Sequence, residues 1–272
     1  MLYSCKELFE RVKRQVAQEI DGFLIEDAPK VCVITTGNDE PSQRYVRNKL
    51  KDFRELGIVA EVKSFKEAKP LLNFLIDAQD YDGIIVQRPV ELAGMNPKEA
   101  AKMVADYINQ TQDIDGVSYG SDFLPPSVRG LDILLKEWNV DPAGKTAVVI
   151  GRGDVGKPVA EYLLSHDATV TICHSKTPYD VLWEAMKSAD MLVGAAGLKS
   201  PVYPSFEHGS GVVIDYGITL YDDSGKLHGD FETASSALVR YQTSVPGGMG
   251  LMVRAGLLLN IVDAYKDRRG KK

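Results

Sequence analysis

Near the middle of the chain the sequence reads Thr146-Ala-Val-Val-Ile-Gly151-Arg-Gly153-Asp-Val-Gly156-Lys-Pro158. The apolar, β-branched start of this segment favours a buried strand. Its glycines, Gly151, Gly153 and Gly156, have the Gly-x-Gly-x-x-Gly spacing, and a helical pattern follows at 159–164. A strand that turns sharply into a helix N-terminus presents backbone N–H groups to a phosphate, and glycine lets the phosphate approach closely. The segment therefore predicts a dinucleotide-binding turn.

A second apolar segment, 169–173, follows that helix after a short loop. The two strands and the helix form a βαβ unit, which is the setting in which the glycine spacing is informative. Without that setting, the same spacing is compatible with a structural glycine turn. We interpret the segment as dinucleotide-binding and keep the structural turn as the alternative.

Strand-like and helical segments alternate through the rest of the chain. The further predicted strands are 31–35, 59–64, 83–87, 191–195 and 212–216, with a hairpin-like excursion at 222–227 and a polar loop at 36–41. The further predicted helices are 4–20, 42–56, 68–77, 97–108, 130–138 and 251–265. Alternation of this kind predicts an α/β fold in which helices cover both faces of a mostly parallel sheet. The turn-forming residues at 141–144 predict two domains, 1–138 and 139–250, with the helix 251–266 packing back onto the first and a frayed tail from Lys266.

The composition limits the class of protein. Of the 272 residues, 44% are hydrophobic and 26% are charged, which is typical of a globular protein. The formal net charge of -6 at pH 7 argues against nucleic acid or an anionic membrane as the main partner. Charged residues occur early and no apolar run is long enough to span a membrane, so we expect a soluble, cytoplasmic protein.

The three cysteines, Cys5, Cys32 and Cys173, are odd in number and widely spaced. This pattern favours reduced, buried thiols over a disulfide framework. With four histidines and no close Cys/His pairing, we expect no metal site.

Ser42, Tyr45 and Lys49 share one face of a predicted helix that follows a predicted strand. Open α/β sheets bind their ligands at the carboxyl ends of the strands, so this face is a candidate site. A solvated helix face is the alternative. Gln87 closes another apolar strand and is followed by Arg88 and a proline, and its alternative interpretation is a loop amide that bonds within the protein.

Asp113 and Asp115 flank Ile114 before Gly116. In an extended segment, alternation would put both carboxylates on one side. The alternative is a turn in which an aspartate bonds to nearby backbone.

Five segments occur in the order that is typical of one enzyme family. They are Pro41-Ser-Gln-Arg-Tyr45-Val-Arg-Asn-Lys49 with Thr36-Gly37 before it, Asp82-Gly-Ile-Ile-Val-Gln87, Asp113-Ile-Asp-Gly116, Thr169-Val-Thr-Ile-Cys-His-Ser-Lys-Thr177 and Val245-Pro-Gly-Gly248. On these motifs the chain resembles the bifunctional methylenetetrahydrofolate dehydrogenase/methenyltetrahydrofolate cyclohydrolase family, over nearly every segment from 29 to 260.

The resemblance implies an N-terminal α/β folate-binding catalytic domain, a Rossmann-like coenzyme domain and folate in the cleft between them. Lys49 would be the central acid/base and electrostatic residue, and Gln87 would hold and tune it. Tyr45 would stack on the folate, and Asp115 would accept the amino and ring N–H groups of the pterin. The resemblance completes the substrate-binding set with Ser42, Pro246, Gly247 and Gly248.

The expected coenzyme-binding residues are Gly151, Arg152, Gly153, Gly156, His174, Ser175, Lys176, Gly217 and Ile218. The second strand of the βαβ unit ends without an Asp or Glu to bind a ribose 2′-hydroxyl. Arg152, Ser175 and Lys176 can instead surround a 2′-phosphate, which predicts NADP over NAD. The alternative is that the two cations are merely solvated. The resemblance also implies a homodimer formed through the coenzyme domain.

Several segments depart from the family pattern. The phosphate loop 151–158 is one residue shorter than Gly-Arg-Ser-x-x-Val-Gly-x-Pro, lacks its serine and carries Asp154. Arg88 and Glu91 lie in the loop after Gln87, where the family has Gln-Leu-Pro-Leu-Pro. Other departures are 125–128 in place of Pro-Cys-Thr-Pro, and Leu251 and Val253 in place of a proline and a threonine. These departures leave two alternatives open: a cyclohydrolase with weakened dehydrogenase activity, and a non-catalytic folate- or nucleotide-binding paralogue.

Overall fold

A computed structural model of the chain describes residues 1–21, 28–37, 40–207, 210–221 and 226–270. The chain forms two compact units. Unit 1 contains Met1–Glu10 and Ser127–Val253, and unit 2 contains Arg11–Pro126 and Arg254–Lys272. The predicted α/β fold with parallel sheets is confirmed. The functional boundaries 1–138 and 139–250 stay predictions, because compactness by itself assigns no function to a segment.

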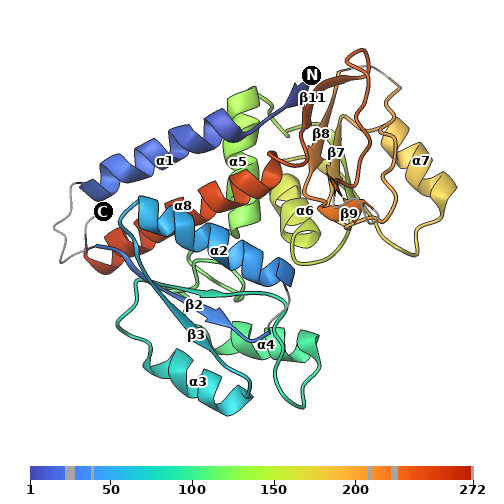
Figure 1. Cartoon of the computed structure of the whole chain (residues 1–272). Coiled ribbons are helices and arrows are strands. Elements are labelled where there is room, and N and C mark those ends of the chain that lie inside the picture. The colour runs from blue at the N-terminus through green and yellow to red at the C-terminus, as the bar shows by residue number, and fades with distance from the viewer. Residues whose placement is uncertain (22–27, 38–39, 208–209, 222–225, 271–272) are drawn as a thin grey trace. The chain divides into compact units, whose positions relative to one another are not determined.

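Unit 1 is built on a parallel sheet with the strand order β1-β11-β8-β7-β5-β6. The strands are β1 (Leu2–Tyr3), β5 (Thr146–Ile150), β6 (Thr169–Cys173), β7 (Met191–Gly194), β8 (Gly211–Asp215) and β11 (Val239–Thr243). The helices α5 (Pro126–Trp138) and α6 (Gly156–Ser165) lie on one face of the sheet, and α7 (Tyr179–Lys187) lies on the other (Figure 1). Covered on both faces, β7 and β8 are buried at every residue.

The direction of strand addition in unit 1 reverses at β5. The next strand along the chain, β6, pairs with one edge of β5, and β7 pairs with the other edge. Such a reversal opens a crevice at the carboxyl ends of the two flanking strands, and ligands of open α/β sheets bind there. In unit 1 these are the carboxyl ends of β5 and β7.

An antiparallel hairpin of β9 (Thr219–Tyr221) and β10 (Lys226–His228) follows β8. Both strands are short, and within the described part of the chain they pair only with each other. The hairpin-like excursion predicted at 222–227 falls on this hairpin, although 222–225 lie outside the described residues, as do 38–39 of the predicted polar loop.

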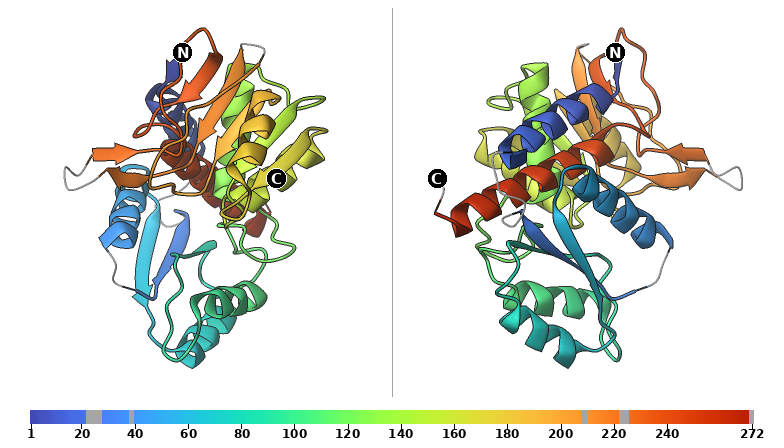
Figure 2. Two further views of the ribbon diagram at one scale, coloured as in Figure 1. Left: turned by 90° about the vertical axis from the view of Figure 1, so that its right-hand side faces the viewer. Right: turned by 60° about the vertical axis from the view of Figure 1, so that its left-hand side comes forward.

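Unit 2 contains a parallel sheet with the order β3-β2-β4. Its elements are α1 (Lys6–Asp21), β2 (Lys30–Thr35), α2 (Glu40–Glu55), β3 (Val59–Ser64), α3 (Ala68–Asp77), β4 (Gly83–Val86), α4 (Pro97–Tyr107) and α8 (Met249–Arg268), of which α1 and α8 begin in unit 1. The helices α3 and α4 cover one face of the sheet, and α2 and α8 lie on the other (Figures 1 and 2). Residues such as Ile34, Leu71, Ile84 and Val104 bury the first of these faces.

The C-terminal helix α8 is anchored to unit 2 by polar contacts. The side-chain amide of Asn260 donates to Ile114 O over 2.8 Å and to Leu124 O over 2.9 Å. Lys266 pairs with Glu19. The expected fraying from Lys266 is therefore wrong, since the helix continues to Arg268 and tertiary contacts hold its end.

The sequence analysis missed three elements, which are β1, β11 and α7. A strand of two residues such as β1 is too short to show a period, and β11 mixes Arg240, Tyr241 and Gln242 with apolar residues. Both segments become strands through hydrogen bonds to neighbouring strands, since β11 pairs with β1 on one side and with β8 on the other. Among the predicted helices, α5 begins four residues earlier than expected, at Pro126, because proline is well tolerated at the start of a helix.

All three cysteines are free and buried, as predicted. Burial raises the pKa of Cys5 and of Cys32 to about 12. Because the thiolate is the reactive form of cysteine, these two thiols are structural rather than catalytic.

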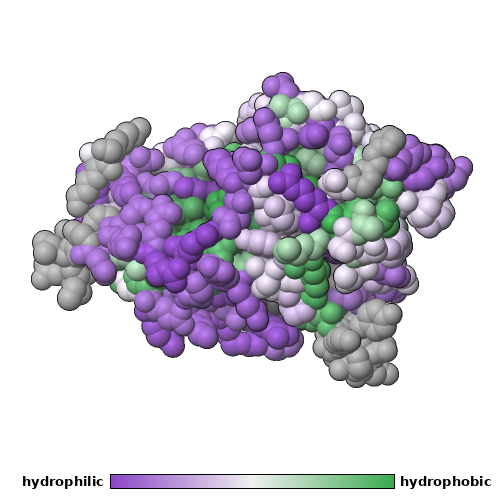
Figure 3. All heavy atoms as spheres, turned by 90° about the horizontal axis from the view of Figure 1, so that it is seen from above, coloured by the Kyte–Doolittle hydropathy of each residue, from purple (hydrophilic) through white to green (hydrophobic). Residues whose placement is uncertain are grey.

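Within the described residues, no helix is both long enough and apolar enough to cross a membrane. Figure 3 shows one face of the molecule, on which hydrophilic side chains predominate and apolar side chains form separate areas among them. Scattered apolar exposure of this kind is normal for protein surfaces.

Candidate active site

Lys49 and Gln87 are brought together at one edge of the sheet in unit 2. Lys49 lies on α2, which follows β2, and Gln87 is the first residue after β4. Because β2 and β4 are parallel neighbours, their carboxyl ends meet at the same edge. The Lys49 Nζ atom donates to Gln87 Oε1 over 3.4 Å, and both side chains are half-buried. Lys49 thus has a hydrogen-bond partner within the protein, and the role of this helix face stays a prediction.

Hydrogen bonds fix the loop that follows Gln87. The Gln87 Nε2 atom donates to Arg88 O over 3.0 Å, and the Ser42 hydroxyl donates to the same oxygen over 3.1 Å. Further along the loop, Glu91 N donates to Thr36 Oγ1 over 2.8 Å. These bonds hold the Gln87 amide with its oxygen toward Lys49.

Asp113 and Asp115 have different surroundings. Gly116 N donates to Asp113 O over 3.0 Å, so the segment is a turn, and the alternation expected of an extended segment does not apply. Asp113 is fully buried and accepts hydrogen bonds from the Ser118 N and Oγ atoms, both over 2.7 Å. The turn alternative thus describes Asp113, whereas Asp115 is half-buried.

Asp115 lies within electrostatic range of two cations. Burial raises the pKa of its carboxyl group, and the positive charge of Lys49 opposes that shift. The charge of Asp113 also raises the pKa, and the charge of Arg88 lowers it. The charges of Lys49 and Arg88 therefore act on Asp115, whereas Asp113 supports the turn.

Tyr45 lies one helical turn before Lys49, with 37% of its surface exposed. Burial raises the pKa of its phenol, and the charge of Arg254 lowers it. Arg254 binds Asp52 in a two-pronged pair, Nε to Oδ2 over 2.6 Å and Nη2 to Oδ1 over 2.5 Å. The sequence analysis missed this pair, for which the only signal was a lone arginine within an apolar helix.

In the glycine turn after β5, Gly151 and Gly156 have no room for a side chain, whereas Gly153 does. Gly151 has a φ of +119°, and a Cβ atom there would lie 2.3 Å from Ala195 O. A Cβ atom on Gly156 would lie 2.2 Å from Gly151 O. Apart from its chain neighbours, no atom of the described residues lies within 4 Å of the Cβ position of Gly153, and this residue is exposed. A turn of this shape at the start of α6 fits the phosphates of a dinucleotide.

The end of β6 lies beside this turn, because Gly151 N donates to Cys173 O over 2.8 Å. Residues 174–177 form a second turn, in which Thr177 N donates to His174 O over 2.8 Å. Lys176 N lies 3.1 Å from His174 Nδ1. Ser175, Lys176 and, in the glycine turn, Arg152 are exposed. Two exposed cations at adjacent strand ends form a suitable environment for a phosphate.

The remaining predicted residues lie at other points of unit 1. Gly217 and Ile218 follow β8, and Gly217 N donates to Asp215 Oδ1 over 2.8 Å. The segment Pro246, Gly247 and Gly248 directly precedes α8. Gly247 has a φ of +94° and its carbonyl accepts a bond from Cys5 N over 2.8 Å.

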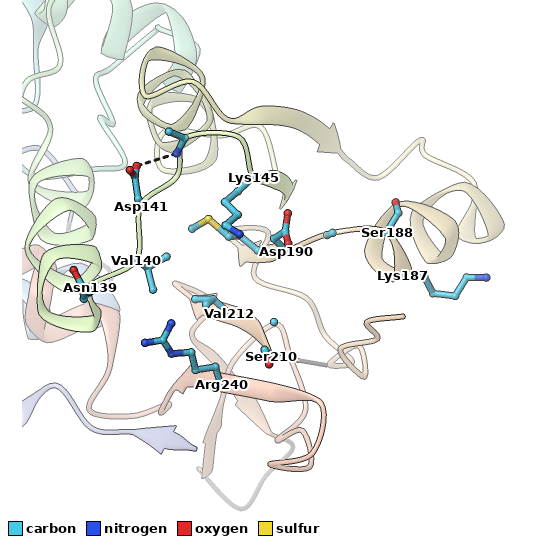
Figure 4. Close-up of a pocket in the computed structure, with 14 residues that line it drawn as sticks. Asn139, Val140, Asp141, Lys145, Lys187, Ser188, Asp190, Ser210, Val212 and Arg240 are labelled. Carbon is cyan, nitrogen blue, oxygen red and sulfur yellow. Dashed lines mark hydrogen bonds between the residues drawn. The ribbon is translucent and has the colours of Figure 1, made fainter. Parts of the chain in front are cut away.

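A hollow of about 360 Å³ lies at the opposite, amino edge of the unit 1 sheet. Figure 4 shows Lys145, Asp190 and Arg240 around it, while Lys187 points away. None of the predicted site residues lines this hollow. It is therefore separate from the glycine turn, which lies at the carboxyl ends of the strands.

Two family models match the chain. Residues 3–115 match the catalytic domain of tetrahydrofolate dehydrogenase/cyclohydrolase, and residues 125–269 match the NAD(P)-binding domain of the same family. The chain belongs to the tetrahydrofolate dehydrogenase/cyclohydrolase family. The Lys49–Gln87 pair lies within the first match, and the glycine turn lies within the second.

Similar proteins span the whole chain. A bifunctional protein FolD of Hydrogenobaculum is 35% identical, over 97% of this chain and 98% of that protein. The crystal structure of a FolD methylenetetrahydrofolate dehydrogenase/cyclohydrolase from Campylobacter jejuni has a TM-score of 0.86 at 30% identity, covering 98% of this chain and 99% of that one. A FolD from Trypanosoma brucei, complexed with NADP cofactor and an inhibitor, has a TM-score of 0.83 at 26% identity, covering 99% of this chain and 98% of that one.

Proposed function

We propose that this protein oxidises 5,10-methylenetetrahydrofolate to 5,10-methenyltetrahydrofolate with NADP, and hydrolyses the product to 10-formyltetrahydrofolate. The observation that carries the proposal is the Lys49–Gln87 pair beside Asp115, in a member of the tetrahydrofolate dehydrogenase/cyclohydrolase family. The names of its bifunctional relatives support both activities.

Lys49 is the proposed acid–base residue. Opening of the methenyl bridge requires that water be activated and that a proton be delivered to a ring nitrogen. Of Ser42, Tyr45 and Lys49 on this helix face, Lys49 is suited to both tasks, because its neutral amine can accept a proton from water and the ammonium so formed can deliver a proton to the ring nitrogen. Gln87 has no titratable proton, and its oxygen accepts from the ammonium group, so its proposed role is to orient Lys49.

Tyr45 and Asp115 are the proposed folate-binding residues. The partly exposed ring of Tyr45 offers an apolar face for stacking, and the Asp115 carboxylate is a suitable acceptor for the two donors of a pterin edge. We add Ser42, Pro246, Gly247 and Gly248 to this set on the basis of the family pattern. Ser42 acts indirectly, since its hydroxyl donates to the carbonyl of Arg88.

The proposed coenzyme site is the carboxyl edge of unit 1. The glycine turn at Gly151, Gly153 and Gly156 would bind the pyrophosphate, and Arg152, Ser175 and Lys176 would bind a 2′-phosphate. His174, Gly217 and Ile218 complete the set. NADP, when bound, supplies the hydride acceptor, and the protein supplies position and electrostatics. Accordingly, we assign folate binding to 1–138 with the helix 251–266, and coenzyme binding to 139–250.

Absorbance of methenyltetrahydrofolate over time tests the proposal. Given the methylene substrate and NADP, the protein should produce methenyl absorbance together with coenzyme reduction. Given the methenyl compound alone, it should remove that absorbance faster than buffer does. Hydrolysis without coenzyme reduction would reduce the function to a cyclohydrolase, and failure of both reactions would contradict the proposal.

Coenzyme choice has its own test. NADP should bind more tightly than NAD, and Arg152→Ala with Lys176→Ala should reduce that preference by about tenfold or more, because charge-assisted bonds to the 2′-phosphate are lost. Titration of both coenzymes into wild type and variant measures the preference. Tighter binding of NAD by the wild type would contradict the assignment.

We also propose that the protein is cytoplasmic and forms a homodimer through its coenzyme domain. The family resemblance supports the dimer, and three free, buried cysteines are typical of a reducing compartment. Sedimentation of the purified chain at several concentrations measures the mass, and a monomer at micromolar concentration would contradict the dimer.

A further inference from the structure

Two carboxylates are buried beneath the coenzyme edge of unit 1. Asp215 ends β8 and is 2% exposed, and Asp230 follows the β9–β10 hairpin and is 0% exposed. No salt bridge joins either one to a cation among the described residues. A buried carboxylate without a cation is costly unless hydrogen bonds satisfy its oxygens.

Backbone N–H groups provide these hydrogen bonds. The Asp230 Oδ2 atom accepts from Ala196 N over 2.7 Å, and its Oδ1 atom accepts from Leu198 N over 2.6 Å. Both donors belong to the loop that follows β7. Asp230 therefore fixes the backbone of this loop at two points.

Asp215 accepts hydrogen bonds from backbone N–H groups at Gly217, Asp230 and Phe231. Its Oδ1 atom accepts from Gly217 N over 2.8 Å and from Asp230 N over 3.0 Å. Its Oδ2 atom accepts from Phe231 N over 2.9 Å. Asp215 thus holds Gly217 of the predicted coenzyme set and also positions the residue that holds the β7 loop.

Glycines make this close packing possible. A Cβ atom on Gly194 would lie 2.7 Å from Asp230 Cβ, and one on Gly217 would lie 2.5 Å from Asp230 N. A Cβ atom on Gly229 would lie 2.1 Å from Asp215 Oδ2. The two aspartates and three glycines form one compact layer below the loops.

The loop that Asp230 holds is the β7 side of the crevice at the strand-order reversal. Its first residue, Ala195, contacts the glycine turn, because the Cβ positions of Gly151 and Gly156 lie 2.3 Å from Ala195 O and 3.5 Å from Ala195 Cβ, respectively. A displacement of the β7 loop would therefore change the space available at the β5 turn.

We propose that Asp230, supported by Asp215, is a positioning residue for coenzyme binding, which sets the β7 loop against the glycine turn. The proposal rests on the coenzyme half of the proposed function. Asp230 acts through the backbone of 196–198 and does not itself touch the coenzyme. Nearly isosteric amide substitution should therefore weaken coenzyme binding without changing the chemistry in unit 2.

Asp230→Asn tests the proposal because an amide has one acceptor oxygen where the carboxylate has two. One of the bonds to Ala196 N and Leu198 N is then replaced by a repulsion between donors. Asp190→Asn is the control for the same substitution elsewhere in the sheet, since the exposed Asp190 accepts from Thr146 N over 2.9 Å at the amino edge. Three measurements apply to both variants: NADP affinity by calorimetry, amide hydrogen exchange, and the coenzyme-independent hydrolysis of the methenyl compound.

For Asp230→Asn we expect NADP affinity to fall at least tenfold and exchange at Ala196 and Leu198 to accelerate, with hydrolysis within twofold of wild type. Asp190→Asn should bind NADP within twofold of wild type. Unchanged NADP affinity in Asp230→Asn would overturn the proposal, as would an equal loss in both variants. If the wild type itself fails to bind NADP, the coenzyme half of the proposed function is wrong.

A measurement on the wild type covers the case in which Asp230→Asn does not fold. Bound NADP should slow exchange at Ala196, Leu198 and Gly217 at least tenfold, because it would stabilise the loops that the aspartates hold. Thr146, bonded to Asp190 at the opposite edge, serves as the reference amide. Equal protection at Thr146 and at the loop amides would overturn the proposal.

Discussion

The two proposed sites of this protein rely on different chemical groups. In unit 2 the proposed functional groups are side chains, namely the ammonium of Lys49, the amide of Gln87 and the carboxylate of Asp115. In unit 1 the edge is made largely of backbone, with glycines at the turn and buried carboxylates below it. A catalytic group must be one specific side chain, whereas a phosphate-binding turn needs N–H groups in fixed positions. Substitutions in the unit 2 site should therefore mainly lower the reaction rates, whereas substitutions in the unit 1 site should mainly change the conformation of the turn.

The largest effect is expected at Lys49. Lys49→Met should lose cyclohydrolase activity by roughly 10²-fold or more, the usual scale of acid–base catalysis, with a smaller loss of dehydrogenase activity and folate still bound. Separate assays of methenyl hydrolysis and coenzyme reduction test this. Lys51→Met, at an exposed position of the same helix, is the control and should keep both rates. Survival of hydrolysis in Lys49→Met would remove Lys49 from its proposed role.

In unit 1, Gly151→Ala should destabilise the fold, because the glycine turn has no room for an added Cβ atom. The added Cβ atom would lie 2.3 Å from Ala195 O at a φ of +119°, so we expect a loss of about 2–3 kcal/mol in the free energy of unfolding. Denaturant unfolding measures this loss. Gly153→Ala, where no atom lies within 4 Å, should lose less than about 1 kcal/mol. Equal losses would mean that packing against Ala195 does not constrain the turn.

The two aspartates of the 113–115 turn should separate substrate binding from stability. Asp115→Ala should weaken folate binding and both activities by about 1–3 kcal/mol, because pterin donors are left without an acceptor. Asp113→Ala should instead lower the free energy of unfolding by about 1–3 kcal/mol, since two bonds from Ser118 are lost. Folate titration and denaturant unfolding of both variants measure the two effects. The opposite pattern would exchange the roles assigned to the two residues.

The smallest expected effect is a pH dependence from Asp215. Burial raises the pKa of this carboxyl group in the folded protein to about 6, against an ordinary value of about 3.9 when unfolded. The folded state then binds more protons than the unfolded state between these values, so this group's contribution to stability falls as pH rises from about 4 to about 6. Relative to Asp215→Asn, the wild type should lose about 1–2 kcal/mol across that window. Urea unfolding at several pH values checks the sign, and a gain over that window would contradict it.

How far the sequence could predict the molecule differs between its regions. The strands Val59–Ser64 and Thr169–Cys173 and the helix Ala68–Asp77 were predicted at their exact bounds, because their local apolar patterns are bounded by glycine, proline or polar residues. In the candidate site, strand ends followed by polar side chains indicated Lys49 and Gln87 as separate candidates, and the family resemblance implied that the two interact.

The interactions that the sequence could not predict join residues far apart in the chain. Arg254 and Asp52 are separated by 202 residues, and Asn260 supports the 113–115 turn across 146 residues. A single arginine or asparagine in an apolar helix indicates a polar partner but not which one. The strand β11 is a similar case, since its mixed sequence becomes a strand through the neighbours that pair with it.

By itself, the sequence determined the parallel α/β fold and the glycine turn, because these depend on local periodicity and on spacing, and it indicated candidate residues for both proposed sites. Only the tertiary structure decided that Asp113 supports a turn while Asp115 lies near Lys49, and that Asp215 and Asp230 hold two loops by their backbone. The physical reason is that an aspartate's role is set by the donors and charges around its carboxylate, and folding brings these from distant parts of the chain.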